Sequence, residues 1–135
     1  MTILNWEEKY AIGHPIIDQQ HRNMLTIGNQ LLLSLQTNRS KQETLQVLEA
    51  LIAESELHFQ TEEELMYRLG FGSYVNHKID HDALKAQIKI LMRECENDRV
   101  KAKNHLISIV RNWLLEHVMS YDKGLGRFLA DRKTT

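Results

Sequence analysis

Apolar side chains recur every three, four or seven residues along four long segments of this sequence, and this repeat restricts the possible fold most strongly. The segments extend from about Asp18 to Gln36, Lys41 to Leu69, Ser73 to Glu96 and Val100 to Ser120. The spacing places the apolar residues of each segment on one face of a helix. One proline, Pro15, occurs in 135 residues, so few positions force a helix to stop. Four amphipathic helices joined by short loops predict an all-α protein, an up-down-up-down antiparallel four-helix bundle.

The length of the chain suits a single domain covering residues 1–135. We expect an N-terminal arm, the four-helix bundle, and a short C-terminal helix with a tail, which are residues 1–17, 18–120 and 121–135. The aromatic residues of the arm indicate that it packs against the bundle. Ser40 followed by Glu43 is typical of a helix start, and Gly70 suits a left-handed helix stop. The last helix is expected over residues 123–129.

Charge and hydropathy exclude several classes of partner. Lysine and arginine number 17 and aspartate and glutamate 18, without a basic block, which argues against binding to nucleic acid or an acidic membrane surface. The N-terminus has no basic and apolar pattern of a secretory signal, and no apolar run approaches the length of a membrane-spanning helix. The one cysteine, Cys95, cannot form a disulfide within the chain. We therefore expect a cytoplasmic protein without membrane insertion.

Histidine is the residue type whose placement is unusual. Five of the seven histidines lie on the faces that should be buried, and every helix contributes at least one of them. They are His21, His58, His77, His81 and His117. Glu62 lies one turn after the second of these, on the same face. Burying one polar group without a partner costs roughly 1–3 kcal/mol, and neutral imidazoles satisfy one another only if donors and acceptors alternate. A metal removes this difficulty because each ring supplies a lone pair.

The spacing of these residues supports a metal site. The pairs His58–Glu62 and His77–His81 each place two ligands one helical turn apart. The second pair, in the sequence HKIDH, lacks the glutamate of a zinc-protease motif. Asp122 follows His117 by five residues, about 140° around an ideal helix. Its position therefore leaves two alternatives open, a further ligand or a solvated residue at a helix end.

The number of ligands indicates more than one ion. Five imidazoles with one or two carboxylates exceed a tetrahedral zinc site, and mixed imidazole and carboxylate ligands suit iron or manganese. If Glu62 and Asp122 both bridge two ions together with one solvent-derived oxygen, the ion with three histidines has six ligands. The ion with two histidines then has five and keeps an open position for a small ligand.

Four motifs, WEEKYAIGHPIIDQQH, HFQTEEELM, HKIDHD and WLLEHVMSYD, together resemble the hemerythrin family, specifically the bacterial hemerythrins. The resemblance implies a non-haem di-iron centre, Fe²⁺ or Fe³⁺ with an oxo or hydroxo bridge, that binds dioxygen reversibly. It also implies the role of each ligand. His77, His81 and His117 would hold the six-coordinate iron, His21 and His58 the iron with the open position, and Glu62 and Asp122 would bridge.

Other residues are assigned around this centre. The candidates for lining an oxygen pocket are Met24, Phe59, Trp113 and Leu114. Members of the family commonly have an aromatic residue three positions after the second histidine of the HxxxH pair, where this chain has Leu84. The substitution bears on the shape of the pocket and the rate of autoxidation, not on ligation. His14 and His105 are expected to be surface or capping groups.

Two physiological roles agree with the resemblance. The first is oxygen carriage or storage. The alternative is oxygen or redox sensing, as the sensory domain of a larger signalling protein, a chemotaxis receptor or a cyclic-dinucleotide enzyme such as a diguanylate cyclase, whose output region is absent from this chain. A parent sequence that continues beyond Thr135 would favour sensing. In neither role is the chain itself an enzyme, since no general acid or extra carboxylate is identified at the open position.

Overall fold

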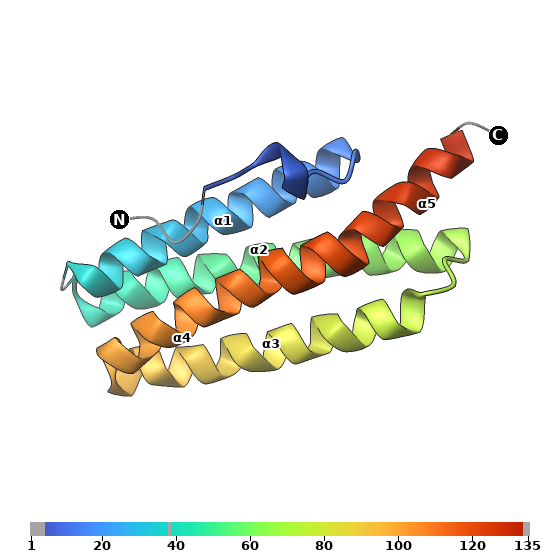
Figure 1. The fold of residues 1–135 in the computed structure, drawn as a ribbon. Helices are drawn as coiled ribbons and strands as arrows, with labels where there is room; N and C mark the ends of the chain where they lie inside the picture. The colour runs from blue at the N-terminus through green and yellow to red at the C-terminus, as the bar shows by residue number, and fades with distance from the viewer. Residues whose placement is uncertain (1–4, 38, 134–135) are drawn as a thin grey trace.

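The computed structural model describes residues 5–37 and 39–133, and within these residues it is helical without strands. Four long helical rods lie side by side (Figure 1), and consecutive rods run in opposite directions. This is the predicted antiparallel four-helix bundle. The described helices, in chain order, are η1 (Glu8–Tyr10), α1 (Pro15–Gln36), α2 (Lys41–Leu69), α3 (Tyr74–Asn97), α4 (Arg99–Asn112), η2 (Trp113–Asp122) and α5 (Lys123–Lys133).

Local sequence explains where the first helices begin and end. Helix α1 starts at Pro15, three residues before the predicted start, because proline suits the first helical position and His14 caps it by accepting a hydrogen bond from the amide of Ile17. Helix α2 has the predicted bounds. The Ser40 hydroxyl caps its first turn, and Gly70 ends it in the left-handed conformation, with φ of 68°.

The fourth rod is longer than the sequence predicts. It does not end near Ser120; α4, η2 and α5 follow one another without a break from Arg99 to Lys133 (Figure 1). The predicted short C-terminal helix is therefore the end of this rod. In its middle, η2 is a π-helix of ten residues, Trp113–Asp122. The first residue of α5, Lys123, donates a hydrogen bond to the carbonyl of Ala11 at 2.6 Å and so ties the N-terminal arm to the rod.

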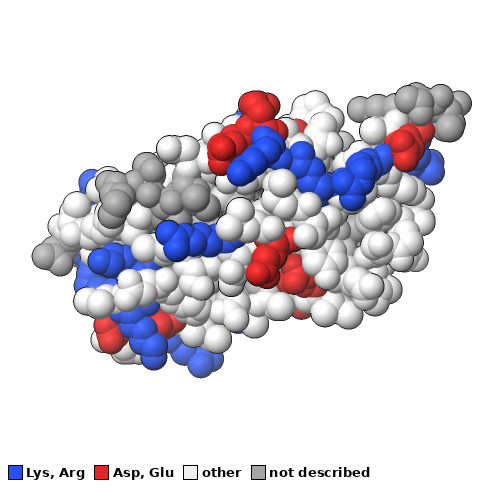
Figure 2. All heavy atoms as spheres, viewed as in Figure 1, with Lys and Arg blue, Asp and Glu red and all other residues white. Residues whose placement is uncertain are grey.

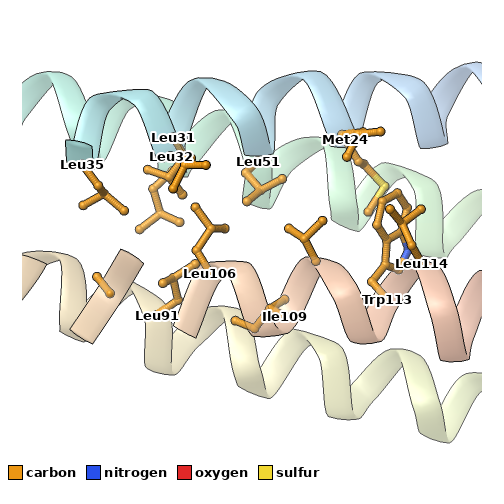
Figure 3. Packing of buried hydrophobic residues seen from close by; sticks show 14 of the residues in the cluster. Met24, Leu31, Leu32, Leu35, Leu51, Leu91, Leu106, Ile109, Trp113 and Leu114 are labelled. Atoms are coloured by element: carbon orange, nitrogen blue, oxygen red, sulfur yellow. The ribbon is translucent and has the colours of Figure 1, made fainter. Parts of the chain in front are cut away.

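Two apolar clusters fill the interior. The larger cluster joins all four rods, and its labelled members include Leu31, Leu51, Leu91 and Leu106 (Figure 3). The smaller cluster consists of Ile12, Ile17, Met66 and Leu125. In α1, α2 and the fourth rod, buried polar residues separate the two clusters along the sequence. The polar layer between them is where the metal site was predicted.

The surface carries both signs of charge. On the face shown in Figure 2, Lys and Arg side chains lie among Asp and Glu side chains rather than apart from them. Among the described residues, no helix is long and apolar enough to cross a membrane.

Candidate metal centre

Two carboxylates lie at the middle of the buried polar layer. Glu62 comes from α2 and Asp122 from the end of η2, and both side chains are completely buried. Five imidazoles from the four rods surround them, and each of these rings turns its Nε2 atom toward the carboxylates. The arrangement brings together all seven predicted ligands, Asp122 included.

Three imidazoles form the first donor group with both carboxylates. His77 Nε2 lies 2.8 Å from Asp122 Oδ1 and 3.3 Å from Glu62 Oε1. His81 Nε2 lies 3.0 Å from Glu62 Oε1, and His117 Nε2 lies 3.1 Å from Asp122 Oδ1. One ligand atom from each of the five residues falls within 4.8 Å of all the others. One cation can therefore contact all five.

Two imidazoles form the second group with the same two carboxylates. His21 Nε2 lies 3.0 Å from Asp122 Oδ2, and His58 Nε2 lies 3.4 Å from Glu62 Oε1. The two ring nitrogens are 2.9 Å apart, and the four ligand atoms again lie within 4.8 Å of one another. Since both groups share Glu62 and Asp122, the layer offers two adjoining cation positions bridged by carboxylates.

The π-helix is what places Asp122 in the site. A π-helix hydrogen bond spans five residues instead of four, and the amide of Lys123 bonds in this way to the carbonyl of Val118. A residue five positions after His117 then returns to the same side of the helix. Of the two alternatives for Asp122, the structure excludes a solvated residue at a helix end, because the side chain is buried beside His117.

Three further polar residues hold the rings from outside. His58 Nδ1 lies 3.1 Å from Gln20 Oε1. His81 Nδ1 lies 2.9 Å from Glu63 Oε2, and His117 Nδ1 lies 2.5 Å from Asp80 Oδ2. When Nε2 binds a cation, Nδ1 carries the proton and donates it to these oxygens.

Sequence reasoning missed these three partners, although a regular pattern relates them. Each is the chain neighbour of a predicted ligand: Gln20 precedes His21, Glu63 follows Glu62, and Asp80 precedes His81. Each nevertheless contacts a histidine of the next rod, not of its own. The contact depends on how the helices pack, and the spacing within one helix does not contain that information.

The electrostatics of the layer favour added positive charge. Burial by itself lowers the pKa of His77, but the carboxylates of Asp122 and Glu62, 2.8 Å and 3.3 Å from its Nε2 atom, outweigh burial and raise that pKa to about 9. Burial also lowers the pKa of His58 and of His117. The charges of Glu62 and Asp122 outweigh burial there too, so both pKa values are raised. Although burial raises the pKa of each carboxyl group, the surrounding imidazoles hold the pKa of Glu62 and of Asp122 below its ordinary value.

Protons alone do not satisfy this layer. Among the described residues, both oxygens of Asp122, one oxygen of Glu62 and the Nε2 of His77 form no hydrogen bond, although all are buried. In addition, His81 Nε2 and His117 Nε2 face each other at 3.1 Å, a contact that requires a proton on one of two inward nitrogens. Buried polar atoms are rarely left unpaired in proteins. The donor set therefore fits a pair of divalent or trivalent metal cations, which accept all these lone pairs at once.

Three of the four predicted pocket residues line one apolar cavity, and two of these three contact ligand rings. Met24, Phe59 and Trp113 line an apolar cavity of about 40 Å³, to which Leu84 and Ser55 also contribute. The Trp113 ring centre is 5.5 Å from that of His21, and Phe59 stacks on His81 at 4.3 Å. Leu114 is fully buried in the larger apolar cluster (Figure 3) but does not line the cavity.

The two remaining histidines lie outside the layer, as predicted. His14 caps α1, and His105 on α4 contacts Glu94 and Gln87 of α3. Cys95 is buried in the larger cluster, where burial raises the pKa of its thiol to about 11 and keeps it protonated.

The fold and the site define a class: a four-helix-bundle protein with a buried cluster of histidines and carboxylates that could hold metal. Comparison with known proteins is more specific. Residues 13–129 match the model of the hemerythrin HHE cation binding domain, so the chain belongs to the hemerythrin family.

Similar proteins agree with this assignment. A bacteriohemerythrin of Methylococcus capsulatus is 28% identical over 132 residues, which are 96% of this chain and 99% of that protein. A bacteriohemerythrin of Aquifex aeolicus is 28% identical over 89% of this chain and 92% of its own length. The crystal structure of a hemerythrin mutant superposes with a TM-score of 0.84 at 25% identity, covering 96% of this chain and 99% of that one.

Proposed function

We propose that the chain binds two iron ions and reversibly binds dioxygen at the iron held by His21 and His58. The proposed role is oxygen carriage or storage. The observation that carries the proposal is the shared donor set. Glu62 and Asp122 belong to both groups, and the groups differ only in having three imidazoles or two. The ligands proposed for one iron are His77, His81 and His117, those for the other are His21 and His58, and both carboxylates bridge.

The difference in imidazoles supports binding of an external ligand. The group of His21 and His58 offers one donor fewer than its neighbour, so an octahedral ion there has a position left for a small molecule. The ring of Trp113 lies against that of His21, with centres 5.5 Å apart, and Met24 lines the same apolar cavity as Trp113. Two ferrous ions, when bound, would supply the electrons that a dioxygen ligand takes up, with an oxo or hydroxo group between them.

The residues around the proposed ligand position favour release of unchanged dioxygen over its chemical reaction. Within the described residues, the apolar cavity beside His21 is lined by no carboxylate and no imidazole. A bound ligand there has no general acid beside it to donate a proton. This arrangement suits a binding protein rather than an enzyme.

Metal analysis combined with oxygenation tests the proposal. The purified protein should hold about two irons per chain, and the reduced form should gain visible absorption in air and lose it under argon. The variant His58→Ala should lose iron and the absorption change, whereas His105→Ala should keep both because His105 lies outside the layer. A folded protein that holds zinc and no iron would contradict the assignment.

One observation favours the sensing alternative. The proposed ligands His117 and Asp122 lie on the same unbroken rod as α5, so a shift of either ligand would move residues that continue directly into α5. Hydrogen exchange of the α5 amides, compared between the oxygenated and the reduced protein, tests this role. Equal exchange in both states would favour carriage or storage, and a change confined to η2 and α5 would favour sensing.

A further inference from the structure

The hydrogen bonds outside the metal layer form a series around the bundle. Gln20 of α1 contacts His58 of α2, Glu63 of α2 contacts His81 of α3, and Asp80 of α3 contacts His117 of η2. Each rod thus orients a ring of the following rod. The series does not close, because the Nδ1 atom of His21 has no hydrogen-bond partner among the described residues.

The outer hydrogen-bond partners of the two donor groups differ in charge. In the three-histidine group, two of the three rings donate to carboxylates, those of Glu63 and Asp80. In the two-histidine group, the one outer partner is the neutral amide of Gln20. The bridging carboxylates are common to both groups and do not contribute to this difference.

A carboxylate on the outer nitrogen changes what the inner nitrogen offers to a metal. It draws the Nδ1 proton toward itself, so the ring becomes a stronger electron donor at Nε2. A ring with more negative charge at Nε2 stabilises a ferric ion more than a ferrous ion, because the ferric ion has the higher charge. Both rings are buried. The side chain of Glu63 is 16% exposed and that of Asp80 is 35% exposed, so solvent screens both effects incompletely, and the effect of Asp80 more than that of Glu63.

We propose that Asp80 and Glu63 are positioning residues that make the three-histidine iron the easier of the two to oxidise. The proposal rests on the proposed di-iron function. In the step concerned, one ferrous ion becomes ferric and its electron passes to an electrode or to a one-electron mediator, without gain or loss of a ligand. The neutral partner Gln20 leaves the two-histidine iron harder to oxidise, and this is the iron with a position for an external ligand.

Two substitutions that remove charge but keep a hydrogen-bond acceptor test the proposal. Asp80→Asn and Glu63→Gln should each lower the ratio of oxidised to reduced iron at a fixed potential about tenfold, which is about 59 mV for a one-electron step. The measurement is spectroelectrochemical titration under argon of protein with a known iron content. Matched controls remove an exposed acidic group one or two positions away, in Asp82→Asn and Glu64→Gln, and should leave the ratio within about threefold.

A third variant adds charge instead of removing it. Gln20→Glu should raise the ratio of oxidised to reduced iron about tenfold, because it gives His58 a carboxylate partner like those of His81 and His117. This variant keeps the proposal testable if Asp80→Asn or Glu63→Gln holds less iron. Midpoint potentials that stay unchanged in all three variants, or that move equally in the two controls, would overturn the proposal.

Failure of the underlying function has a different signature. The iron content of the unmodified protein decides the di-iron function, before any potential is measured. With two irons bound and reversible oxygenation intact, unchanged potentials in the variants would refute only the role given to Asp80 and Glu63.

Discussion

At the residue scale, the buried imidazoles bind either protons or metal ions. In the metal-free protein, the two carboxylates hold protons on the rings, and the pKa of His77 is raised from 6.5 to about 9. A metal must displace these protons, so metal affinity falls as the pH falls. The same protons contribute to the stability of the metal-free fold.

We therefore predict that the metal-free protein loses stability as the solution becomes alkaline. A group with a raised pKa in the folded state stabilises the fold fully below its unfolded value of 6.5, and this contribution is lost as the pH rises through about 9. The loss expected from His77 is on the order of 3 kcal/mol. Urea unfolding at pH 6 and pH 9.5 measures it. The iron-loaded protein should lack this decline, and a metal-free protein that is more stable at pH 9.5 would contradict the prediction.

A second prediction concerns the bridge. Glu62→Gln keeps the size of the side chain but removes the charge that both donor groups share, so the protein should hold one iron or none instead of two. Metal analysis of the folded variant measures this result. The control is Glu64→Gln, on the exposed side of the same helix, which should retain two irons. Two irons in Glu62→Gln would show that Asp122 alone bridges.

At the scale of the elements, the sequence predicted the helices and their inward faces but not the phase of the fourth rod. The histidines of α1, α2 and α3 follow the ordinary helical repeat, and the repeat was sufficient to find them. Asp122 does not follow it. Residues 113–122 contain neither proline nor glycine that would mark an irregular helix. The local sequence pattern therefore does not predict the π-helix.

The outer partners illustrate the same limit. Glu63 and Asp80 are ordinary polar residues on helices with many others, and only the packing of one rod against the next makes them contact His81 and His117. The bounds of the fourth rod were also predicted too short. Gly124 and Gly126 follow Ser120 closely and could end a helix, but both lie inside α5.

The close approach between α5 and the arm gives a prediction at this scale. A Cβ atom at Gly126 would lie 2.5 Å from the carbonyl oxygen of Ile12, whereas one at Gly124 would have no neighbour within 4 Å. Gly126→Ala should therefore destabilise the protein by about 1–3 kcal/mol. Gly124→Ala should stabilise it by about 0.5–1 kcal/mol, because alanine favours the helix. Urea unfolding of both variants checks the pair, and equal effects would show that the arm moves aside without cost.

At the scale of the whole molecule, the metal layer lies between two apolar clusters, and we expect the two clusters to have different structural roles. The larger cluster joins all four rods. The smaller one, with Ile17, Met66 and Leu125, lies three or four residues along the chain from the ligands His21, Glu62 and Asp122. The first cluster should act on the stability of the fold, and the second on the stiffness of the site.

This division predicts how core mutations combine with metal removal. Leu31 is fully buried in the larger cluster, ten residues and hence about 15 Å along α1 from His21. Leu31→Ala should lower the free energy of unfolding by about 2–5 kcal/mol. The loss should be the same within about 0.5 kcal/mol with and without iron, because distant sites act additively.

Met66→Ala should lower the free energy of unfolding more in the iron-loaded protein than in the metal-free protein, since the cavity it leaves lies one turn after Glu62 and loosens a shared ligand. Urea unfolding of both variants in both metal states separates these contributions. If Leu31→Ala also costs more with iron bound, the larger cluster and the metal layer form one cooperative unit, and the bundle depends on its metal along its whole length.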